Sequence, residues 1–248
     1  GAAASFSCHS SMPRAATADA LLAACKSGDA RSVARLLRRD GSLANCADSD
    51  GCSPLNWASF NGLESVVRLL LKNGATIDRA DSMGGTPLFV ACLKGQDATA
   101  RLLLENGASV NHADNVGFTP LSIACDEGHE STARLLLGKG ATVDLARNDG
   151  DTPLYIACQY GHNSTARLLL EKGASIDLAH NDGCTPLFMA IQVGNVSTVR
   201  LLLDKCASVD LECRGYTPLH IACHCKGEAI VRLLARRGAR IDPRDADE

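Results

Sequence analysis

Apolar residues occur along this chain in paired short clusters, and each pair is followed by a stretch rich in turn-forming residues. In the segment 86–107 the first cluster, 87–94, stops at a glycine, and the second, 97–106, contains three consecutive leucines. Thr86 can cap a helix with its hydroxyl, and proline suits the next position because its missing N–H costs nothing there. The pattern predicts two short helices, 87–94 and 97–106, the second ended by Gly107. A loop or short hairpin comes next.

The same pattern recurs at a nearly constant period. The tripeptide Ser/Thr-Pro-Leu returns six times, the first five copies 33 residues apart and the last after 32. It begins at Ser53, Thr86, Thr119, Thr152, Thr185 and Thr217. A fixed period of this length indicates a stack of similar units that bury apolar surface between neighbours. Such a stack favours binding and offers catalysis no obvious enclosed site.

Three features of each unit resemble the ankyrin repeat: the Thr-Pro-Leu-x-x-Ala start, the glycine in mid-repeat, and the Leu-Leu-x-x-Gly-Ala close. The resemblance implies an all-α solenoid of about seven helix-turn-helix units with projecting β-hairpin-like loops. We expect a flexible N-terminal segment at 1–18 and one repeat domain at 19–248. The expected repeats lie near 19–47, 48–80, 81–113, 114–146, 147–179, 180–211 and 212–248. The first lacks Thr-Pro-Leu and is expected to be an N-terminal cap.

The resemblance also implies where a partner would bind. Ankyrin proteins commonly bind other proteins through the loop tips and the first-helix face, which form the concave side. Carried over to this chain, those positions include Asp50, Phe60, Met83, Leu93, Lys94, Val116, Phe118, Asp126, Glu127, Asp149, Asp151, Tyr160, Asp182, Gln192, Tyr216 and His224. The middle of this set is acidic and interleaved with aromatic residues, which favours a basic or amphipathic peptide as partner. The alternative is that the acidic tips only keep the solenoid in solution.

Aromatic residues follow Thr-Pro-Leu in several repeats, at Phe89, Tyr155 and Phe188, where only His220 keeps the family's histidine. These rings either pack beneath the loops or help to line the binding groove. The sixth repeat departs from the pattern, because Cys206 replaces the glycine that ends the other second helices and one residue is missing from the following loop. A non-glycine residue in the left-handed region costs about 1–2 kcal/mol. We therefore expect a weakened joint there.

Charge argues against nucleic acid and membrane as partners. The formal net charge is −3, and the longest apolar runs are far shorter than the roughly 20 residues of a spanning helix. One arginine recurs in each second helix, at Arg35, Arg68, Arg101, Arg134, Arg167, Arg200 and Arg232. This row suggests phosphate binding. Acidic residues four positions away neutralise most of it, so a solvated structural face is the better interpretation.

Five of the twelve cysteines, Cys25, Cys92, Cys125, Cys158 and Cys223, share one place in their repeats. Packed helices lie about 8–10 Å apart and a disulfide needs Cα atoms within roughly 7 Å, so this cysteine ladder cannot link itself. We expect buried, reduced thiols and an intracellular, cytoplasmic location. A second Cys/His group, Cys213, His224 and Cys225, has no fixed geometry for zinc. We therefore expect neither a metal nor another cofactor.

No nucleophile–base pair, phosphate-binding loop or paired-carboxylate pocket stands out. The sequence thus predicts a non-enzymatic protein-interaction module or scaffold, monomeric by itself. The alternative is a substrate-recruiting or regulatory part of a larger enzyme, such as a kinase or ubiquitin ligase, whose catalytic domain lies elsewhere.

Overall fold

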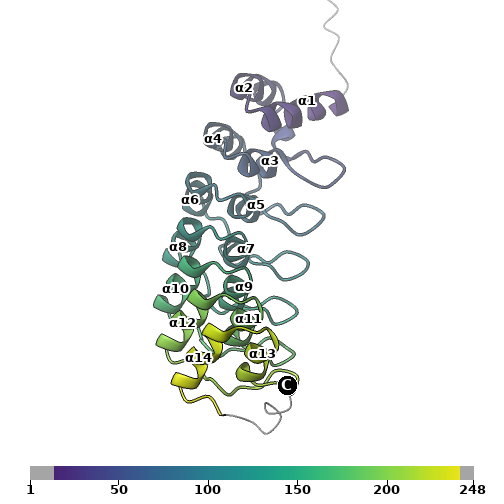
Figure 1. The fold of residues 1–248 in the computed structure, drawn as a ribbon. Helices are drawn as coiled ribbons and strands as arrows, with labels where there is room; N and C mark the ends of the chain where they lie inside the picture. Colours follow the sequence, from purple (N-terminus) through teal and green to yellow (C-terminus); the bar gives the residue numbers. More distant parts are fainter. Residues whose placement is uncertain (1–13, 241–248) are drawn as a thin grey trace, which may run out of the picture.

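The computed structural model describes residues 14–240 as a curved stack of helix pairs (Figure 1). The first helices of the pairs are α1 (Arg14–Ser27), α3 (Pro54–Phe60), α5 (Pro87–Leu93), α7 (Pro120–Asp126), α9 (Pro153–Gln159), α11 (Pro186–Gln192) and α13 (Pro218–His224). The second helices are α2 (Ala30–Arg39), α4 (Glu64–Lys72), α6 (Asp97–Glu105), α8 (Glu130–Gly138), α10 (Asn163–Glu171), α12 (Val196–Asp204) and α14 (Glu228–Arg236), and a 3₁₀ turn, η1 (Gly41–Asn45), follows α2.

Each unit folds as the local sequence predicts. The Thr86 hydroxyl accepts a hydrogen bond from the amide of Phe89 at 3.2 Å, and Pro87 opens α5. The predicted helices 87–94 and 97–106 end one residue early, because Lys94 and Asn106 are C-caps. Gly107 then takes a φ of +91°, which glycine adopts without steric cost. Local capping therefore sets the helix boundaries.

The core is continuous along the stack, because first helices pack on first helices and second on second. Leu88, Ala91, Cys92 and Leu103 are fully buried in the third unit, and their counterparts are buried in the neighbouring units. No helix among the described residues has the combination of length and apolar character that crossing a bilayer requires. The all-α repeat solenoid that the sequence predicts is confirmed.

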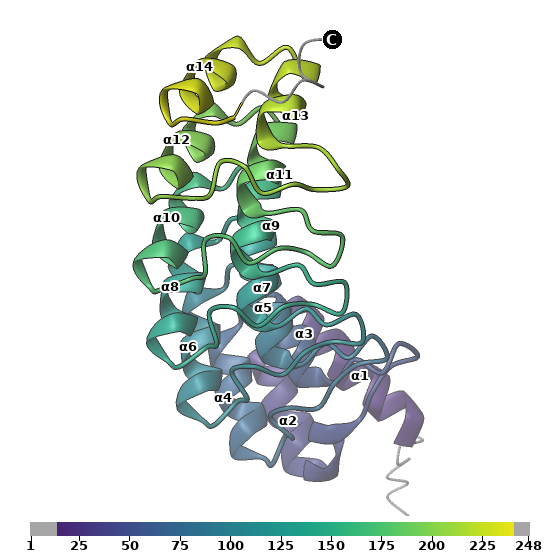
Figure 2. The ribbon, with the colours of Figure 1, turned by 90° about the horizontal axis from the view of Figure 1, so that it is seen from below.

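The loops project from one edge of every unit, alongside the first helices (Figure 2). In Figure 1 the row of second helices bulges away from the loops, so the loops and first helices lie on the concave side. Neighbouring loops are joined through the backbone, for example by the amide of Asn115, which donates to the carbonyl of Met83 at 3.0 Å. The only β-bridge within residues 14–240 pairs Cys213 with Tyr216. The described loops therefore turn back on themselves as a hairpin does, but they form almost no β-ladder hydrogen bonds.

The N-terminal boundary differs from the prediction. Helix α1 begins at Arg14, so residues 14–18, which we expected to be flexible, belong to the first helix. The alanine-rich sequence after Arg14 has strong helix propensity and extends the helix backwards from the packed part. The rest of the predicted flexible segment, 1–13, and the end of the last repeat, 241–248, lie outside the described residues.

The cysteine ladder is confirmed in four of its five members, which are buried and free: Cys25, Cys92, Cys125 and Cys158. Burial raises the pKa of Cys25 to about 12 and raises the pKa values of the other three above their usual range. Cys223 is exposed, contrary to the prediction, because α13 belongs to the last described unit and has no following first helix to cover it.

The expectation of reduced thiols is wrong for one pair outside the ladder. Cys184 and Cys213 form a disulfide between the loops of the sixth and seventh units, with Cα atoms 4.6 Å apart. Loop backbones approach each other more closely than packed helices do, so the spacing argument for the ladder does not extend to them. At the same joint Cys206 takes a φ of +65°, as predicted, and Arg214 is also left-handed, at +52°. Lys226, in the turn between α13 and α14, has a φ of +53°.

Candidate functional site

The concave face consists of the first-helix ends and the loop tips, and it exposes large apolar side chains. Met83 is 67% exposed at one loop tip, and Val116 occupies the same position in the next loop. Tyr160 and Val193 are the C-caps of α9 and α11, and both are about half exposed. Isolated exposed apolar residues are common, but here they recur at equivalent positions and form a row along one face.

An apolar hollow of about 270 Å³ lies between the second and third units. Trp57 and Phe60 reach it from α3, and Phe89 and Leu93 reach it from α5. Met83 reaches it from the loop that connects α4 to α5. We call this set the apolar hollow. Trp57 is fixed by its indole N–H, which donates to Asp48 at 2.8 Å. The rings and methylenes leave a concavity of a size that suits one apolar side chain.

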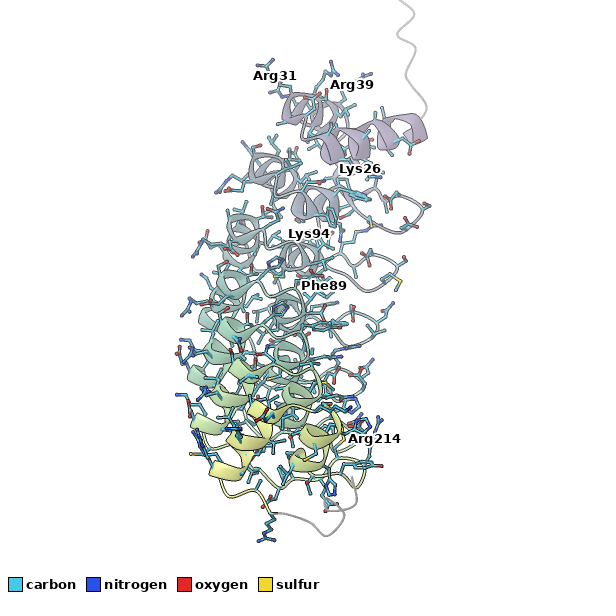
Figure 3. The ribbon with its side chains drawn as sticks, viewed as in Figure 1. Lys26, Arg31, Arg39, Phe89, Lys94 and Arg214 are labelled. Carbon is cyan, nitrogen blue, oxygen red and sulfur yellow. A yellow bond between two sulfur atoms is a disulfide. The ribbon has the colours of Figure 1, made fainter. Side chains whose placement is uncertain are left out.

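Two lysines flank the hollow. The ammonium of Lys26, near the end of α1, lies 4.1 Å from the ring centroid of Trp57, and that of Lys94 lies 4.9 Å from the centroid of Phe60. Both distances suit cation–π contacts, which hold the lysines against the rims. Figure 3 shows Lys26, Lys94 and Phe89 in the N-terminal part of the stack, and Arg214 near its C-terminal loops.

A larger, polar pocket of about 460 Å³ lies between the loops of the fifth, sixth and seventh units. Tyr155, Phe188 and the Cys184–Cys213 disulfide contribute its buried lining, and Tyr216, 55% exposed, stands at its edge. Tyr155 also stacks on His180, with ring centroids 5.6 Å apart. Tyr155 and Phe188 therefore pack beneath the loops and also line a pocket, so both interpretations of these aromatic positions apply.

Asp151 and Asp182 provide the negative charge of the polar pocket. Asp151 is 7% exposed, and burial, followed by the charge of Asp149, raises its pKa. Its Oδ2 accepts a hydrogen bond from Arg147 at 3.2 Å, whereas its buried Oδ1 accepts none. The pKa of Asp182 lies below its usual value. Burial alone would raise it, but hydrogen bonds from the Cys184 amide, His180 and Arg214 outweigh the effect of burial.

A third acidic feature lies at the end of α7. Asp126 is half-buried and Glu127 is exposed, and neither forms an ion pair with any residue in the described part of the chain. Burial, and then the charge of Glu127, raise the pKa of Asp126. This pair lies one repeat beyond Leu93 and Lys94, on the same row of first-helix ends.

The predicted contact residues therefore divide into separate groups. Phe60, Met83 and Leu93 line the apolar hollow, and Asp151, Asp182, Gln192 and Tyr216 line the polar pocket. Lys94, Asp126, Glu127 and Tyr160 lie at first-helix ends, and Asp50, Val116 and Asp149 at loop tips. Phe118 is half-buried under the Arg147 guanidinium at 3.9 Å, and His224 shares a small hollow with Tyr216.

The sequence-based prediction omitted several side chains that the structure places in these hollows, among them Trp57, His180 and Arg214. Trp57 carried a usable signal, because it is the only tryptophan of the chain and it follows a Ser-Pro-Leu start. His180 gave no such signal. It stands at a loop position where other repeats have an aspartate that accepts hydrogen bonds from its own loop, as Asp114 does from the amides of Val116 and Phe118.

The arginine row on the second-helix face is paired only in part as the sequence predicts: Arg68, Arg134 and Arg232 form ion pairs with the acid four residues before them. Arg101, Arg167 and Arg200 form no ion pair with a described residue, and Asp204 pairs with Arg237 instead. Glu130 pairs with Arg134 at 2.6 Å, and Glu64 with Arg68 at 3.9 Å. A shallow hollow of about 930 Å³ on this face is lined by acids and bases together. Exposed helical pairs of this kind contribute only about 0.3–0.5 kcal/mol each, and they leave no continuous positive stripe.

Within residues 14–240, two groups of side chains have metal-ligand atoms close together, and the atoms of both already contact other groups of the protein. In the first, Asp182 lies beside the sulfurs of Cys184 and Cys213, which are bonded to each other. In the second, Asp149 and Asp151 share the Arg147 guanidinium at 3.2 Å each, with His180 nearby. The disulfide also removes Cys213 from the Cys213, His224 and Cys225 group, so that group offers zinc at most two ligands.

Comparison with known proteins agrees with this architecture. The family model for ankyrin repeats, in three copies, matches residues 21–114, 110–180 and 176–245. The crystal structure of the human ASB11 ankyrin repeat domain is similar, with a TM-score of 0.80 and 29% sequence identity over 90% of this chain and 99% of that one. No curated protein matches this sequence. Ankyrin repeat domains are generally non-catalytic modules that bind other proteins. The chain belongs to the ankyrin repeat family.

Proposed function

We propose that this chain is a non-enzymatic scaffold module that binds another protein or peptide on its concave face. The observation that carries the proposal is the row of exposed apolar side chains at loop tips and first-helix ends, beside an apolar hollow. Aromatic and apolar anchors surrounded by polar residues are the usual composition of an interface centre. The second-helix face offers charged pairs and no comparable apolar row.

The proposed partner is basic or amphipathic. Asp50, Asp126 and Glu127 are acidic groups of the concave face that form no ion pair with a described residue. We further propose that the chain acts as a monomer in the cytoplasm and binds neither nucleic acid nor membrane. The three ion pairs along the arginine row support the part on nucleic acid. The Cys184–Cys213 disulfide is the observation that weighs against a reducing cytoplasm.

The same surface would serve a substrate-recruiting or regulatory domain of a larger enzyme. The ankyrin repeat architecture is compatible with either role. The two proposals predict the same contacts and differ in whether the full reading frame encodes a catalytic domain.

Charge reversal on the concave face tests the proposal. A partner captured from cells and then purified is titrated against the variant Asp126→Lys, Glu127→Lys, Asp149→Lys, and we expect at least a tenfold weaker affinity. The matched control reverses three exposed carboxylates of the second helices, Glu64, Glu105 and Glu171, and changes the net charge equally. Unchanged affinity in the first variant, or an equal loss in the control, would remove the concave face from the proposal.

A further inference from the structure

The first-helix ends form one row that a partner segment has to cross. The last residues of α3, α5, α7, α9 and α11 are Phe60, Leu93, Asp126, Gln159 and Gln192. Each lies one repeat from the next, and first helices pack directly on one another. The row is apolar in the second and third units, acidic in the fourth, and uncharged in the fifth and sixth. The row of first-helix ends therefore favours partner segments whose apolar and basic residues follow one another in the matching order.

The apolar part of the row has a definite capacity. Its hollow of about 270 Å³ is bounded by the rings of Trp57, Phe60 and Phe89 and by the side chains of Met83 and Leu93. Its lining also includes the loop carboxylates Asp81 and Asp114, which accept hydrogen bonds from amides of their own loops. The five apolar residues belong to helices or to a loop whose backbone is hydrogen-bonded to both neighbouring loops, for example by the Ser82 amide, which donates to the Asp50 carbonyl at 3.0 Å. A preformed hollow of this size accepts one leucine or aromatic side chain at little ordering cost.

The charges beside the hollow determine which residues of a partner can lie next to the anchor. Lys94 extends back over the ring of Phe60, toward the second unit, and so lies at the rim of the hollow. Asp126 and Glu127, the next charged groups along the row, have no cation from the described residues as ion-pair partner. Burial and the charge of Glu127 raise the pKa of the Asp126 carboxyl, and the nearby Arg147 and His162 offset only part of this effect, so an incoming cation would stabilise the charged form further.

We infer that the concave face binds one extended segment through an apolar anchor in the hollow and through neighbouring lysine or arginine residues at Asp126 and Glu127. Adjacent first helices lie about 8–10 Å apart, and an extended chain advances about 3.3–3.6 Å per residue. The centre of the hollow lies between α3 and α5, about one and a half helix spacings from the end of α7. The basic residues therefore lie about three to four positions from the anchor, on the side that faces the fourth unit. This inference rests on the proposed function and specifies the partner's chemistry.

The only tryptophan of the chain lies in the hollow and reports on its occupation. Synthetic peptides without tryptophan or tyrosine are titrated while Trp57 fluorescence is recorded at low salt. The test peptide contains one leucine with two lysines beginning three residues away, and it is used in both chain directions. We expect saturable fluorescence changes with the better direction. Replacing leucine by serine in the peptide should weaken binding about 10- to 100-fold.

Charge swapping tests the order of the two contacts. Changing the peptide lysines to glutamates should weaken binding by about fivefold or more, and the variant Asp126→Lys, Glu127→Lys should reverse that preference. Met83→Ser removes an exposed wall of the hollow and should weaken binding of the leucine peptide. Leu178→Ser changes another exposed apolar residue, outside the hollow, and should leave binding unchanged.

Two results would overturn the inference: equal affinity for lysine and glutamate peptides, or binding that leaves Trp57 fluorescence unchanged. The proposed function would survive either result, because it depends on the captured partner and on the concave-face reversal. Loss of partner binding in that reversal together with an unresponsive hollow would place the contact elsewhere on the concave face. An unaffected partner together with a responsive hollow would contradict the proposed function instead.

Discussion

Replacing Cys206 by glycine should stabilise the stack. Cys206 follows the C-cap of α12, takes a φ of +65°, and exposes its side chain. Glycines at the equivalent positions, such as Gly107 and Gly173, have φ values of +91° and +88°, and a Cβ added to either would contact nothing within 4 Å. The cost at Cys206 is therefore backbone strain alone, since the thiol neither packs in the core nor collides with a neighbour.

The magnitude results from two opposing contributions. A non-glycine residue in the left-handed region costs about 1–2 kcal/mol, and the substitution removes this cost. Glycine also gives the unfolded chain more freedom, which offsets about 0.4–1 kcal/mol of the gain. The free energy of unfolding should therefore rise by roughly 0.5–1 kcal/mol. The capping hydrogen bond from the Cys206 amide to the Leu203 carbonyl, 3.2 Å long, is retained because it involves only the backbone.

Urea unfolding, followed by circular dichroism, measures this change as a shift of the midpoint at constant slope. The mirror substitution, Gly173→Cys, should lower stability by a similar amount, because it introduces the same strain at the same register. An unchanged or lower midpoint for Cys206→Gly would refute the idea of a strained joint. An unchanged urea midpoint for Gly173→Cys would refute it as well, because Gly173 and Cys206 share the left-handed backbone conformation.

Three other substitutions test separate parts of the structure. The variant Cys184→Ser, Cys213→Ser should lose about 3–4 kcal/mol of unfolding free energy, the chain-entropy value for a separation of 29 residues, and dithiothreitol should affect only the parent. Asn56→Ala removes the capping box of α3 and the 3.0 Å bond from Asn56 Nδ2 to the Gly85 carbonyl, so urea unfolding should show a loss of about 1–3 kcal/mol. The pKa of Asp126 is raised by burial, so the folded protein holds that proton more tightly than the unfolded chain. Asp126→Asn should therefore increase stability at pH 7, and the gain should shrink as the pH falls through the folded pKa; a constant gain down to pH 3 would contradict the assignment.

The sequence predicts the repeating part of the fold because each unit contains its own helix-capping and helix-ending residues. Thr86 and Pro87 set the start of a helix, Gly107 sets the end of the next, and every copy repeats them with little change. The start of α1 was missed because the first unit lacks the Ser/Thr-Pro-Leu signal, so that only alanine-rich propensity marks it. Boundaries follow from local chemistry wherever the motif is present.

The candidate site was predicted as a row of positions, and its division into two pockets was not. Met83 and Tyr160 were placed on the concave face by register alone, which fixes where a side chain starts. Whether that side chain lines a hollow depends on the side chains of the neighbouring repeat. Phe89 of the third unit, for example, lines a hollow together with Trp57 of the second unit. That information lies in pairs of repeats, so one repeat read alone cannot supply it.

One inter-repeat register shows how constant backbone spacing supports different chemistry. Residues 29 positions apart meet between neighbouring loops: the Cys52 thiol reaches Asp81 at 3.9 Å, and the Arg147 guanidinium covers the Phe118 ring. One unit further on, His180 approaches Asp151 at 3.8 Å, and after that Cys184 bonds to Cys213. Thiol–carboxylate, cation–π, carboxylate–imidazole and disulfide contacts thus occupy equivalent places. The stack fixes which positions meet, and the residues at this register decide how firmly each pair of loops is joined. The covalent pair lies at the joint that also holds two left-handed non-glycine residues, Cys206 and Arg214, so a covalent loop contact and local backbone strain occur at the same joint.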